Sequence, residues 1–329
     1  MVNIAINGFG RIGRLVFRIG FKEKGLNLVA INDLTDAKTL AHLLKYDSVH
    51  GPFDAKVEAG ENYIKVDGKK VDIICEKDHT RLPWKKFNVD IVVESTGLFT
   101  KESDLMDHLK CGAKKVLLSA PAKEGKVKTV VLGTNDEECK NVKYVSNASC
   151  TTNSLVPVVD VLEREFGVEK GFMTTVHAYT NDQRLLDLPH KDLRRARAAG
   201  VNIIPTTTGA AKSVGEVIPK LKGKMDGISL RVPVPCGSIT DFVCLLKKEA
   251  TVEQINKAMK KASQTYMKGI LEYSEEALVS SDIIGNKHSS IFDASLTKTN
   301  GNLVKVFAWY DNEYGYSYRM VDMIKLMAK

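Results

Sequence analysis

The chain has 329 residues, of which 43% are hydrophobic and 27% charged, as in an ordinary soluble globular protein long enough for two domains. Its formal charge of +8 comes from small, scattered groups of lysines rather than from one basic stripe with interleaved aromatic residues, so we expect no dedicated nucleic-acid partner. No apolar run approaches the roughly 20 residues that a membrane span needs, and the N-terminus lacks the regions of a signal peptide.

The first elements along the chain predict a βαβ unit. Residues 2–6 form a short apolar run, a glycine motif follows, and apolar residues recur at helical spacing before a second apolar run at 28–33. Further strand-like runs follow at 71–75, 89–93, 116–118, 130–132 and 144–146. Helical segments such as 101–110 lie between some of them, and this alternation predicts a parallel, doubly wound α/β sheet that is covered by helices.

The pattern changes after residue 149. A helix is expected from about 150 to 166, with a kink at Pro157, because proline lacks an N–H and clashes with the preceding turn. Two later helices are expected, one at 252–265 with Thr251 and Gln254 as a capping box and one at 313–327. Strand-like runs occupy 172–179, 228–234, 239–247, 289–296 and 303–310.

These patterns predict two domains. Residues 1–149 are expected to form a Rossmann-type dinucleotide-binding domain, and residues 150–312 an α+β catalytic domain with a mostly antiparallel sheet. The final helix, 313–329, is expected to pack back on the first domain. The segment 180–202 has no clear periodicity, and a loop of this length is usually functional or interfacial.

Gly8, Gly10 and Gly13 lie between a predicted strand and a predicted helix, which is the context that a dinucleotide-binding turn requires. The helix N-terminus supplies N–H donors and a partial positive charge for the pyrophosphate. Asp33 ends the second strand, where a carboxylate accepts both ribose hydroxyls and repels a 2′-phosphate. The motif therefore predicts NAD rather than NADP. The alternative is a structural glycine turn, with Asp33 capping the next helix.

Cys150 opens the expected helix within the segment SCTTN at 149–153. In the first turn of a helix, the dipole and the backbone N–H groups favour the thiolate. His177 lies near the end of the run 172–179, and an imidazole beside the sulfur would stabilise the thiolate and act as base or acid. Each residue alone is more often structural. With the cofactor motif they predict a thiolate that traps an aldehyde and a nicotinamide that accepts hydride.

The other five cysteines have the pattern of core or strand residues. None of the six forms a C-x-x-C pair, which argues against a zinc site and against thioredoxin-like chemistry. We expect no metal and a cytoplasmic protein with reduced thiols.

At these residues the sequence resembles the NAD-dependent, phosphorylating glyceraldehyde-3-phosphate dehydrogenases, and residues 181–190 are similar to the bacterial type. The resemblance covers essentially the whole chain, from IAINGFGRIG at 4–13 to WYDNEYGY at 309–316. The segment 149–153 together with the glycine motif is highly specific. Other matching segments are AIND at 30–33, SAPA at 119–122, SNASCTTN at 146–153, TVHAYT at 175–180 and TGAAK at 208–212.

The resemblance implies oxidation of glyceraldehyde 3-phosphate with inorganic phosphate to 1,3-bisphosphoglycerate, in glycolysis, by a homotetramer. Cys150 would form a hemithioacetal, and His177 would remove the hydroxyl proton as hydride passes to nicotinamide. Phosphate would then attack the thioester. By resemblance, Thr180 and Arg231 bind the substrate phosphate. The resemblance assigns inorganic phosphate to Ser149, Thr151, Arg195, Thr208 and Gly209.

For NAD, the resemblance adds Arg11, Ile12, Lys77, Ser119 and Asn312, of which Asn312 would orient the nicotinamide amide. Leu188 and Pro189 would reach the adenosine ribose of a neighbouring subunit, and Arg194 and Arg197 would lie at a subunit interface. Ser154 stands where the family often has a second cysteine, so a disulfide to that position is impossible here.

Three other functions remain open at this point. The nearest is a sister enzyme that oxidises another phosphorylated aldehyde, such as erythrose 4-phosphate. A cysteine hydrolase that uses Cys150 and His177 would leave the cofactor motif without a purpose. A binding or signalling protein would use the fold without turnover.

Overall fold

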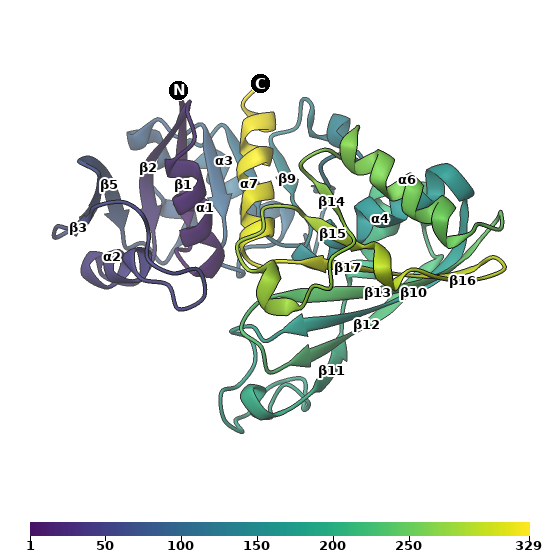
Figure 1. Ribbon diagram of the computed structural model, residues 1–329. Coiled ribbons are helices and arrows are strands. Elements are labelled where there is room, and N and C mark those ends of the chain that lie inside the picture. The colour runs from purple at the N-terminus through teal and green to yellow at the C-terminus, as the bar shows by residue number, and fades with distance from the viewer. The chain divides into compact units, whose positions relative to one another are not determined.

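The computed structural model describes residues 1–329, which divide into two compact units (Figure 1). The first unit comprises Met1–Val130, Asp136–Ala148 and Ser317–Lys329, and the second comprises Val131–Asn135 and Ser149–Tyr316. Each unit is built around one β-sheet. Among the helices, none has both the length and the apolar character that crossing a membrane requires.

The first unit contains a nine-stranded sheet with the order β3-β4-β5-β2-β1-β6-β7-β9-β8. At its centre, β1 (Val2–Asn7) pairs in parallel with β2 (Leu26–Asn32) on one side and with β6 (Ile91–Glu94) on the other. The strand order therefore reverses at β1, which is where doubly wound sheets bind their ligands. Apart from Val2 at the start of β1, the apolar residues of β1 and β6 are almost fully buried, as expected for a sheet that is covered on both faces.

The remaining strands of this sheet are β3 (Val57–Ala59), β4 (Tyr63–Val66), β5 (Lys69–Ile74), β7 (Lys115–Leu118), β8 (Lys128–Thr129) and β9 (Tyr144–Ser146). The pairs β3–β4 and β4–β5 are antiparallel, so the sheet is mixed. The predicted strand at 130–132 is wrong, because β8 ends at Thr129 and the three apolar residues that follow are buried without extending a strand. A short apolar run indicates burial but does not by itself distinguish a strand from a buried loop.

Four helices contribute to the first unit: α1 (Arg11–Phe21), α2 (Ala37–Lys45), α3 (Glu102–Lys110) and the end of α7 (Tyr314–Met327). The apolar face of α1 is buried, as its periodicity predicts. From Ser317 onward α7 belongs to this unit and lies beside α1 (Figure 1), where Lys325 Nζ is 2.7 Å from Glu23 Oε2. Met320, Met323 and Ile324 of α7 are at most 1% exposed.

The second unit contains an eight-stranded sheet with the order β11-β12-β10-β13-β17-β15-β14, and β16 pairs with β17. Most pairs are antiparallel, which confirms the predicted fold class, whereas β10–β12 and β14–β15 are parallel. Its strands are β10 (Val168–Ala178), β11 (Ile204–Thr207), β12 (Met225–Val232), β13 (Ser238–Leu246), β14 (Leu271–Ser274), β15 (Ser290–Asp293), β16 (Lys298–Asn300) and β17 (Leu303–Tyr310).

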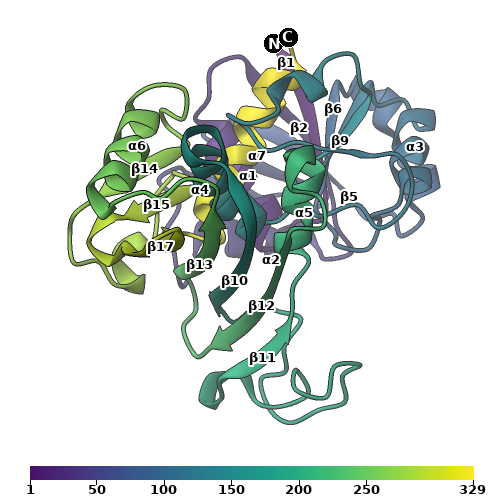
Figure 2. The ribbon, with the colours of Figure 1, turned by 90° about the vertical axis from the view of Figure 1, so that its right-hand side faces the viewer.

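Three helices complete the second unit: α4 (Cys150–Phe166), α5 (Ala210–Val217) and α6 (Val252–Gln264). α4 and α5 pack against each other and against the sheet (Figure 2). The capping box of Thr251 and Gln254 at the start of α6 is confirmed. α4 continues through Pro157 to Phe166, and the predicted kink at Pro157 stays a prediction.

Candidate active site

Gly8, Gly10 and Gly13 form the turn between β1 and α1. Gly8 has a φ of +89°, and a Cβ at this position would lie 2.6 Å from the backbone nitrogen of Thr96. A Cβ on Gly13 would lie 2.2 Å from the carbonyl oxygen of Gly8. By contrast, no heavy atom lies within 4 Å of the Cβ position of Gly10. Two glycines are thus required by the protein's own packing, whereas Gly10 leaves open space where a pyrophosphate would approach.

The carboxylate of Asp33 faces this glycine turn. Its Oδ2 accepts a hydrogen bond from the backbone N–H of Phe9 (2.8 Å), and its Oδ1 accepts one from Thr35 (3.0 Å). The N-cap of α2 is Asp36, which accepts from the N–H of Thr39 (2.9 Å), so the alternative that Asp33 caps the next helix is wrong. Each oxygen of Asp33 keeps a lone pair for a ribose hydroxyl.

Arg11 and Ile12 begin α1, beside the glycine turn. The guanidinium of Arg11 makes two hydrogen bonds to the carboxylate of Asp47, at 2.7 and 3.1 Å. Although burial opposes ionisation, the backbone N–H of His50 and the Arg11 guanidinium lower the pKa of Asp47 to about 2. The side chain of Arg11 is therefore anchored to Asp47, while its backbone lies in the first turn of α1.

Lys77 and Ser119 follow the carboxyl ends of two parallel strands, β5 and β7. Because the carboxyl ends of parallel strands meet at one edge of a sheet, both residues lie along the edge that carries the glycine turn and Asp33. Lys77 is exposed, and the N–H of Ser119 donates to the carbonyl of Glu94 (2.9 Å). Asn312, the remaining residue assigned to NAD, belongs to the second unit.

In the second unit, Cys150 is the first residue of α4, and Ser149 is its N-cap. The hydroxyl of Ser149 accepts a hydrogen bond from the N–H of Thr152 (3.1 Å), which fixes the opening turn of the helix. His177 lies at the end of β10 and is 4% exposed. The Sγ of Cys150 is 3.5 Å from the Nε2 of His177, so the structure brings the two predicted catalytic side chains together.

The tautomer of His177 follows from its neighbours. Its Nδ1 is 2.6 Å from the carbonyl oxygen of Ala178, and because a carbonyl only accepts, Nδ1 carries a proton. The guanidinium of Arg231 lies 3.2 Å from Nδ1 but only donates, so its hydrogen bonds go to the Ala178 carbonyl (3.2 Å) and the Thr180 hydroxyl (2.8 Å). In the neutral ring, the lone pair of Nε2 therefore faces the sulfur.

Burial raises the pKa of the Cys150 thiol, against the opposing effects of the Arg231 charge and Thr151. Burial and Arg231 lower the pKa of His177 to about 3. The backbone N–H groups at the start of α4 also favour the thiolate, but, contrary to expectation, they do not outweigh the effect of burial. Transfer of the proton from Sγ to Nε2 creates opposite charges 3.5 Å apart, whose attraction is large in a site of low polarity. The two groups therefore titrate as a pair.

A second cluster joins Thr180, Arg231 and Arg195. The Thr180 hydroxyl accepts from Arg231 and donates to the carboxylate of Asp182, which also pairs with Arg195. Although burial opposes ionisation, the Thr180 hydroxyl and the two arginines hold the pKa of Asp182 below its usual value. Arg195 also donates to the hydroxyl of Thr206 (2.8 Å). Asp182 was not among the predicted site residues, although an acidic residue two positions after Thr180 was a signal for it.

Tyr310 was also missed. Its hydroxyl lies 2.9 Å from the Oγ1 of Thr151 and 2.8 Å from that of Thr175, and its ring makes an edge contact with His177 at 5.9 Å between centroids. Burial raises the pKa of Tyr310, which keeps the phenol neutral. Tyr310 thus connects a predicted phosphate-binding hydroxyl to the strand that carries the imidazole.

Thr208 and Gly209 precede α5, with Gly209 as its N-cap. The hydroxyl of Thr208 accepts from the N–H of Ala210 (3.2 Å), and the Cβ position of Gly209 has no heavy atom within 4 Å. The predicted inorganic-phosphate residues therefore lie at two helix N-termini, those of α4 and α5, together with Arg195. Helix N-termini favour anions through their free N–H groups and the dipole.

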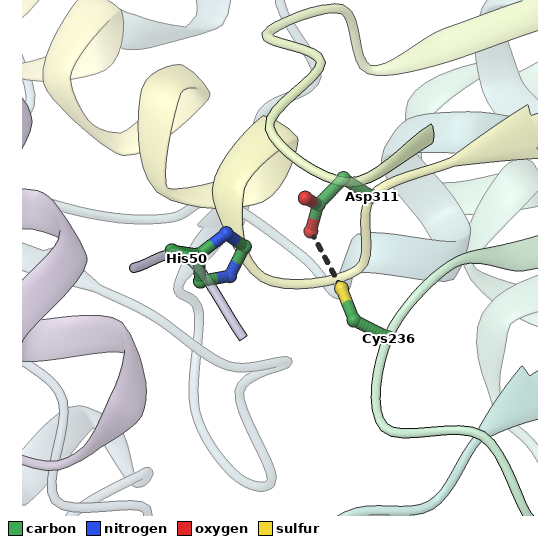
Figure 3. A group of neighbouring side chains, drawn as sticks. All are labelled: His50, Cys236 and Asp311. Atoms are coloured by element: carbon green, nitrogen blue, oxygen red, sulfur yellow. Dashed lines mark hydrogen bonds between the residues drawn. The ribbon is translucent and has the colours of Figure 1, made fainter. Parts of the chain in front are cut away.

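Asn312 has a defined amide orientation. The N–H of Ala178 donates to Ser238 Oγ (3.1 Å), and the single proton of that hydroxyl goes to Asn312 Oδ1 (2.8 Å). The amide nitrogen of Asn312 is left as the donor for a ligand. The preceding Asp311 accepts from Cys236 Sγ at 3.0 Å (Figure 3) and from the N–H groups that open α7.

A doubly wound sheet with an open glycine turn, and a second unit with a paired cysteine and histidine, define an NAD-dependent oxidoreductase that acts on an aldehyde. Residues 2–102 match the model of the glyceraldehyde 3-phosphate dehydrogenase NAD binding domain, and residues 149–312 match that of the C-terminal domain. The chain belongs to the glyceraldehyde-3-phosphate dehydrogenase family, and neither the erythrose 4-phosphate alternative nor a hydrolase is favoured.

Relatives of this chain share more than half of its residues over its full length. A glyceraldehyde-3-phosphate dehydrogenase of Borreliella burgdorferi is 57% identical over 100% of both chains, and one of Thermotoga maritima is 58% identical over 100% of both. One of Geobacillus stearothermophilus is 56% identical over 99% of this chain and 98% of its own.

The glycine turn offers a matched pair of substitutions. Gly13→Ala should lower the free energy of unfolding by roughly 1–3 kcal/mol, because the new Cβ meets the Gly8 carbonyl. Gly10→Ala should leave the thermal midpoint nearly unchanged but weaken NAD binding. Thermal denaturation and titration calorimetry measure the two effects. Tight NAD binding by Gly10→Ala would contradict the proposed route of the pyrophosphate.

Asp33 should set the preference between dinucleotides. The wild-type kcat/KM should be higher with NAD than with NADP, and Asp33→Asn should narrow that ratio by removing the charge that repels a 2′-phosphate. The matched control is Asp36→Asn, which alters the cap of α2 and should leave the ratio unchanged. A wild-type preference for NADP would remove the role given to Asp33.

Proposed function

We propose that this chain oxidises glyceraldehyde 3-phosphate with NAD and inorganic phosphate to 1,3-bisphosphoglycerate, through a thioester on Cys150. The observation that carries the proposal is the 3.5 Å contact between the Cys150 sulfur and the unprotonated Nε2 of His177. Residues 1–149 with 313–329 would bind NAD, and residues 150–312 would bind the aldehyde and phosphate. The names and full-length similarity of the relatives support the substrate.

In the first half-reaction, His177 Nε2 takes the thiol proton and the sulfur of Cys150 attacks the aldehyde carbon. The resulting oxyanion faces the imidazolium and the N–H at the start of α4, and takes a proton from Nε2 to give the hemithioacetal. Nε2 then removes that proton again as the carbon is oxidised to the thioester. NAD supplies the hydride acceptor for this step when it is bound.

In the second half-reaction, inorganic phosphate attacks the thioester carbon and the thiolate of Cys150 leaves. A thiolate is a good leaving group, and the N–H groups of α4 that favour it are already in place. We assign inorganic phosphate to Ser149, Thr151, Arg195, Thr208 and Gly209. Thr180 and Arg231, which are hydrogen-bonded to each other, would hold the phosphate of the substrate.

The residues that we assign to NAD are Gly8, Gly10, Arg11, Ile12, Gly13, Asp33, Lys77, Ser119 and Asn312. The open space at Gly10 and the carboxylate of Asp33 fit a pyrophosphate and a ribose. Leu34 and Leu98 follow the carboxyl ends of β2 and β6 and are 62% and 75% exposed, which fits a site for the apolar faces of adenine. The amide nitrogen of Asn312 would donate to the carboxamide oxygen of nicotinamide.

We further propose a cytoplasmic homotetramer. Large apolar side chains are exposed on the loop before β11 and on the sheet of the second unit, a pattern that marks protein–protein contacts. They are Phe172, Leu185, Leu186, Leu188, Leu193, Val201, Ile203, Ile228 and Leu303. Leu188 and Pro189 would reach a neighbour's adenosine ribose, and Arg194 and Arg197 would lie at the interface.

Cys150→Ser should abolish NADH formation from glyceraldehyde 3-phosphate, NAD and phosphate, while NAD binding in calorimetry stays close to wild type. The hydroxyl of serine is a far weaker nucleophile than the thiol and a poorer leaving group. When phosphate is omitted from the wild-type assay, NADH formation should stop once the Cys150 sulfur has been acylated. Full activity in the Cys150→Ser variant would refute the covalent route.

His177→Asn should move the pH profile of Cys150 alkylation to higher pH. Burial still raises the pKa of the thiol, and the variant lacks the imidazolium that stabilises the thiolate. A rise of one pKa unit corresponds to about tenfold slower alkylation at neutral pH. The measurement is the rate of reaction with iodoacetamide against pH, with Cys150→Ser as the background for other thiols. An unchanged profile would exclude a functional contact between these residues.

Sedimentation equilibrium should give the mass of four chains. Leu186→Lys should shift the distribution to smaller species, because it places a charge on an exposed apolar loop. Val279→Lys, at a position that is 55% exposed outside this group, is the matched control. A monomeric wild-type protein would contradict the tetramer.

A further inference from the structure

A buried polar network lies directly beneath the glycine turn and takes no part in the proposed chemistry. Glu94, the last residue of β6, is 1% exposed, and Asn7, the last residue of β1, is 0% exposed. His108 of α3 is also 0% exposed. A carboxylate within the apolar run IVVE, at the end of a buried strand, is the sequence signal for this network.

Four donor groups converge on the carboxylate of Glu94. Its Oε1 accepts from the backbone N–H (2.9 Å) and the hydroxyl (2.5 Å) of Thr96. Its Oε2 accepts from the amide nitrogen of Asn7 (2.6 Å) and from Nε2 of His108 (3.1 Å). In every one of these contacts a Glu94 oxygen is the acceptor. This is the pattern of a buried carboxylate whose lost hydration is replaced by hydrogen bonds.

Neighbouring groups that do not contact Glu94 determine the direction of these hydrogen bonds. The indole N–H of Trp84 donates to His108 Nδ1 (3.0 Å), so the proton of the neutral ring is on Nε2 and points at Glu94. The backbone N–H of Glu76 donates to Asn32 Oδ1 (2.9 Å), and Asn32 Nδ2 donates to Asn7 Oδ1 (2.8 Å). The nitrogen of Asn7 is therefore also turned toward Glu94. If residue 94 carried a hydrogen-bond donor in place of the carboxylate, Asn7 could not flip its amide to accept from it, and His108 could not change its tautomer to do so.

The network is in direct contact with the glycine turn. Thr96, held by Glu94, lies against Gly8 so closely that a Cβ on Gly8 would be 2.6 Å from its nitrogen. Ser95, between Glu94 and Thr96, donates its hydroxyl to the Gly8 carbonyl (2.7 Å) and its N–H to the Asn7 carbonyl (2.8 Å). The turn is thus fastened to the end of β6 on one side and to Asp33 on the other.

We propose that Glu94 is a positioning residue for the dinucleotide, which it does not touch. By accepting from Thr96 and Asn7 together, it holds the ends of β6 and β1 in the register that aims the first N–H groups of α1 at the pyrophosphate. Well-packed apolar side chains in place of buried charged groups are often equally or more stabilising, so we infer that Glu94 contributes a defined geometry rather than stability. This inference rests on the assignment of NAD to the glycine turn.

Glu94→Gln is the direct test, because it keeps the shape of the side chain and turns one acceptor into a donor. Whichever way the amide is turned, its NH2 faces a group that only donates: the Thr96 N–H, or the nitrogens of Asn7 and His108. The dissociation constant for NAD should rise by about tenfold or more, and that for ADP-ribose should rise by the same factor. The kcat at saturating NAD and the alkylation rate of Cys150 should stay within about twofold of wild type.

Two variants serve as controls. Trp84→Phe perturbs the outer end of the network but leaves the contacts of Glu94 with Thr96 and Asn7 in place. It should lower the thermal midpoint while raising the dissociation constant for NAD by much less than Glu94→Gln does, which separates positioning from general destabilisation. Asn312→Ala should weaken NAD but not ADP-ribose, because it acts on the nicotinamide. If Asn312→Ala behaves in this way while Glu94→Gln binds both ligands like wild type, the proposal for Glu94 is wrong and the proposed function stands.

Asn7→Ala tests the same connection if Glu94→Gln does not fold, because it removes the donor that joins β1 to Glu94. A parallel rise in both dissociation constants supports the proposal, and unchanged constants overturn it. Failure of the wild-type protein to bind either ligand would instead refute the assignment of NAD to the glycine turn.

Discussion

The proposed chemistry depends on the proton that His177 Nδ1 shares with the carbonyl of Ala178. That hydrogen bond leaves the Nε2 lone pair facing a sulfur 3.5 Å away. With the opposite tautomer, Nε2–H would point at the thiol, and the imidazole could not take its proton. The backbone of β10 thus selects the base, because the Ala178 carbonyl, which also accepts from Arg231, can only accept from Nδ1.

Groups that only donate or only accept set the direction of hydrogen bonds throughout both units. In the second unit, the N–H of Ala178 orients the Ser238 hydroxyl, which in turn orients the amide of Asn312. In the first unit, a backbone N–H and the Trp84 indole orient the groups around Glu94. A backbone N–H can only donate and a backbone carbonyl can only accept. The position of these groups on the strands therefore determines which side-chain atoms are donors at each ligand site.

Much of the fold was accessible from local pattern. The glycine turn, the last strand at 303–310 and the capped helix after Thr251 agree with prediction because each is encoded by nearby residues. The strand wrongly predicted at 130–132 and strands that were not predicted, such as β3 and β4, depend instead on residues far away in sequence. Pairing depends on which segments lie alongside each other, and short runs carry little information about that.

The sequence by itself determined the residues whose roles follow from local backbone: three glycines in a turn, a carboxylate ending the next strand, and a cysteine opening a helix. Tertiary structure alone decided which tautomer His177 adopts, that burial opposes the thiolate of Cys150, and that Asp182, Tyr310 and Glu94 complete the surroundings. The reason is physical. Backbone conformation is governed by neighbours in sequence, whereas desolvation and hydrogen-bond partners come from residues far away in the chain, such as Thr151 and Tyr310, which are 159 positions apart.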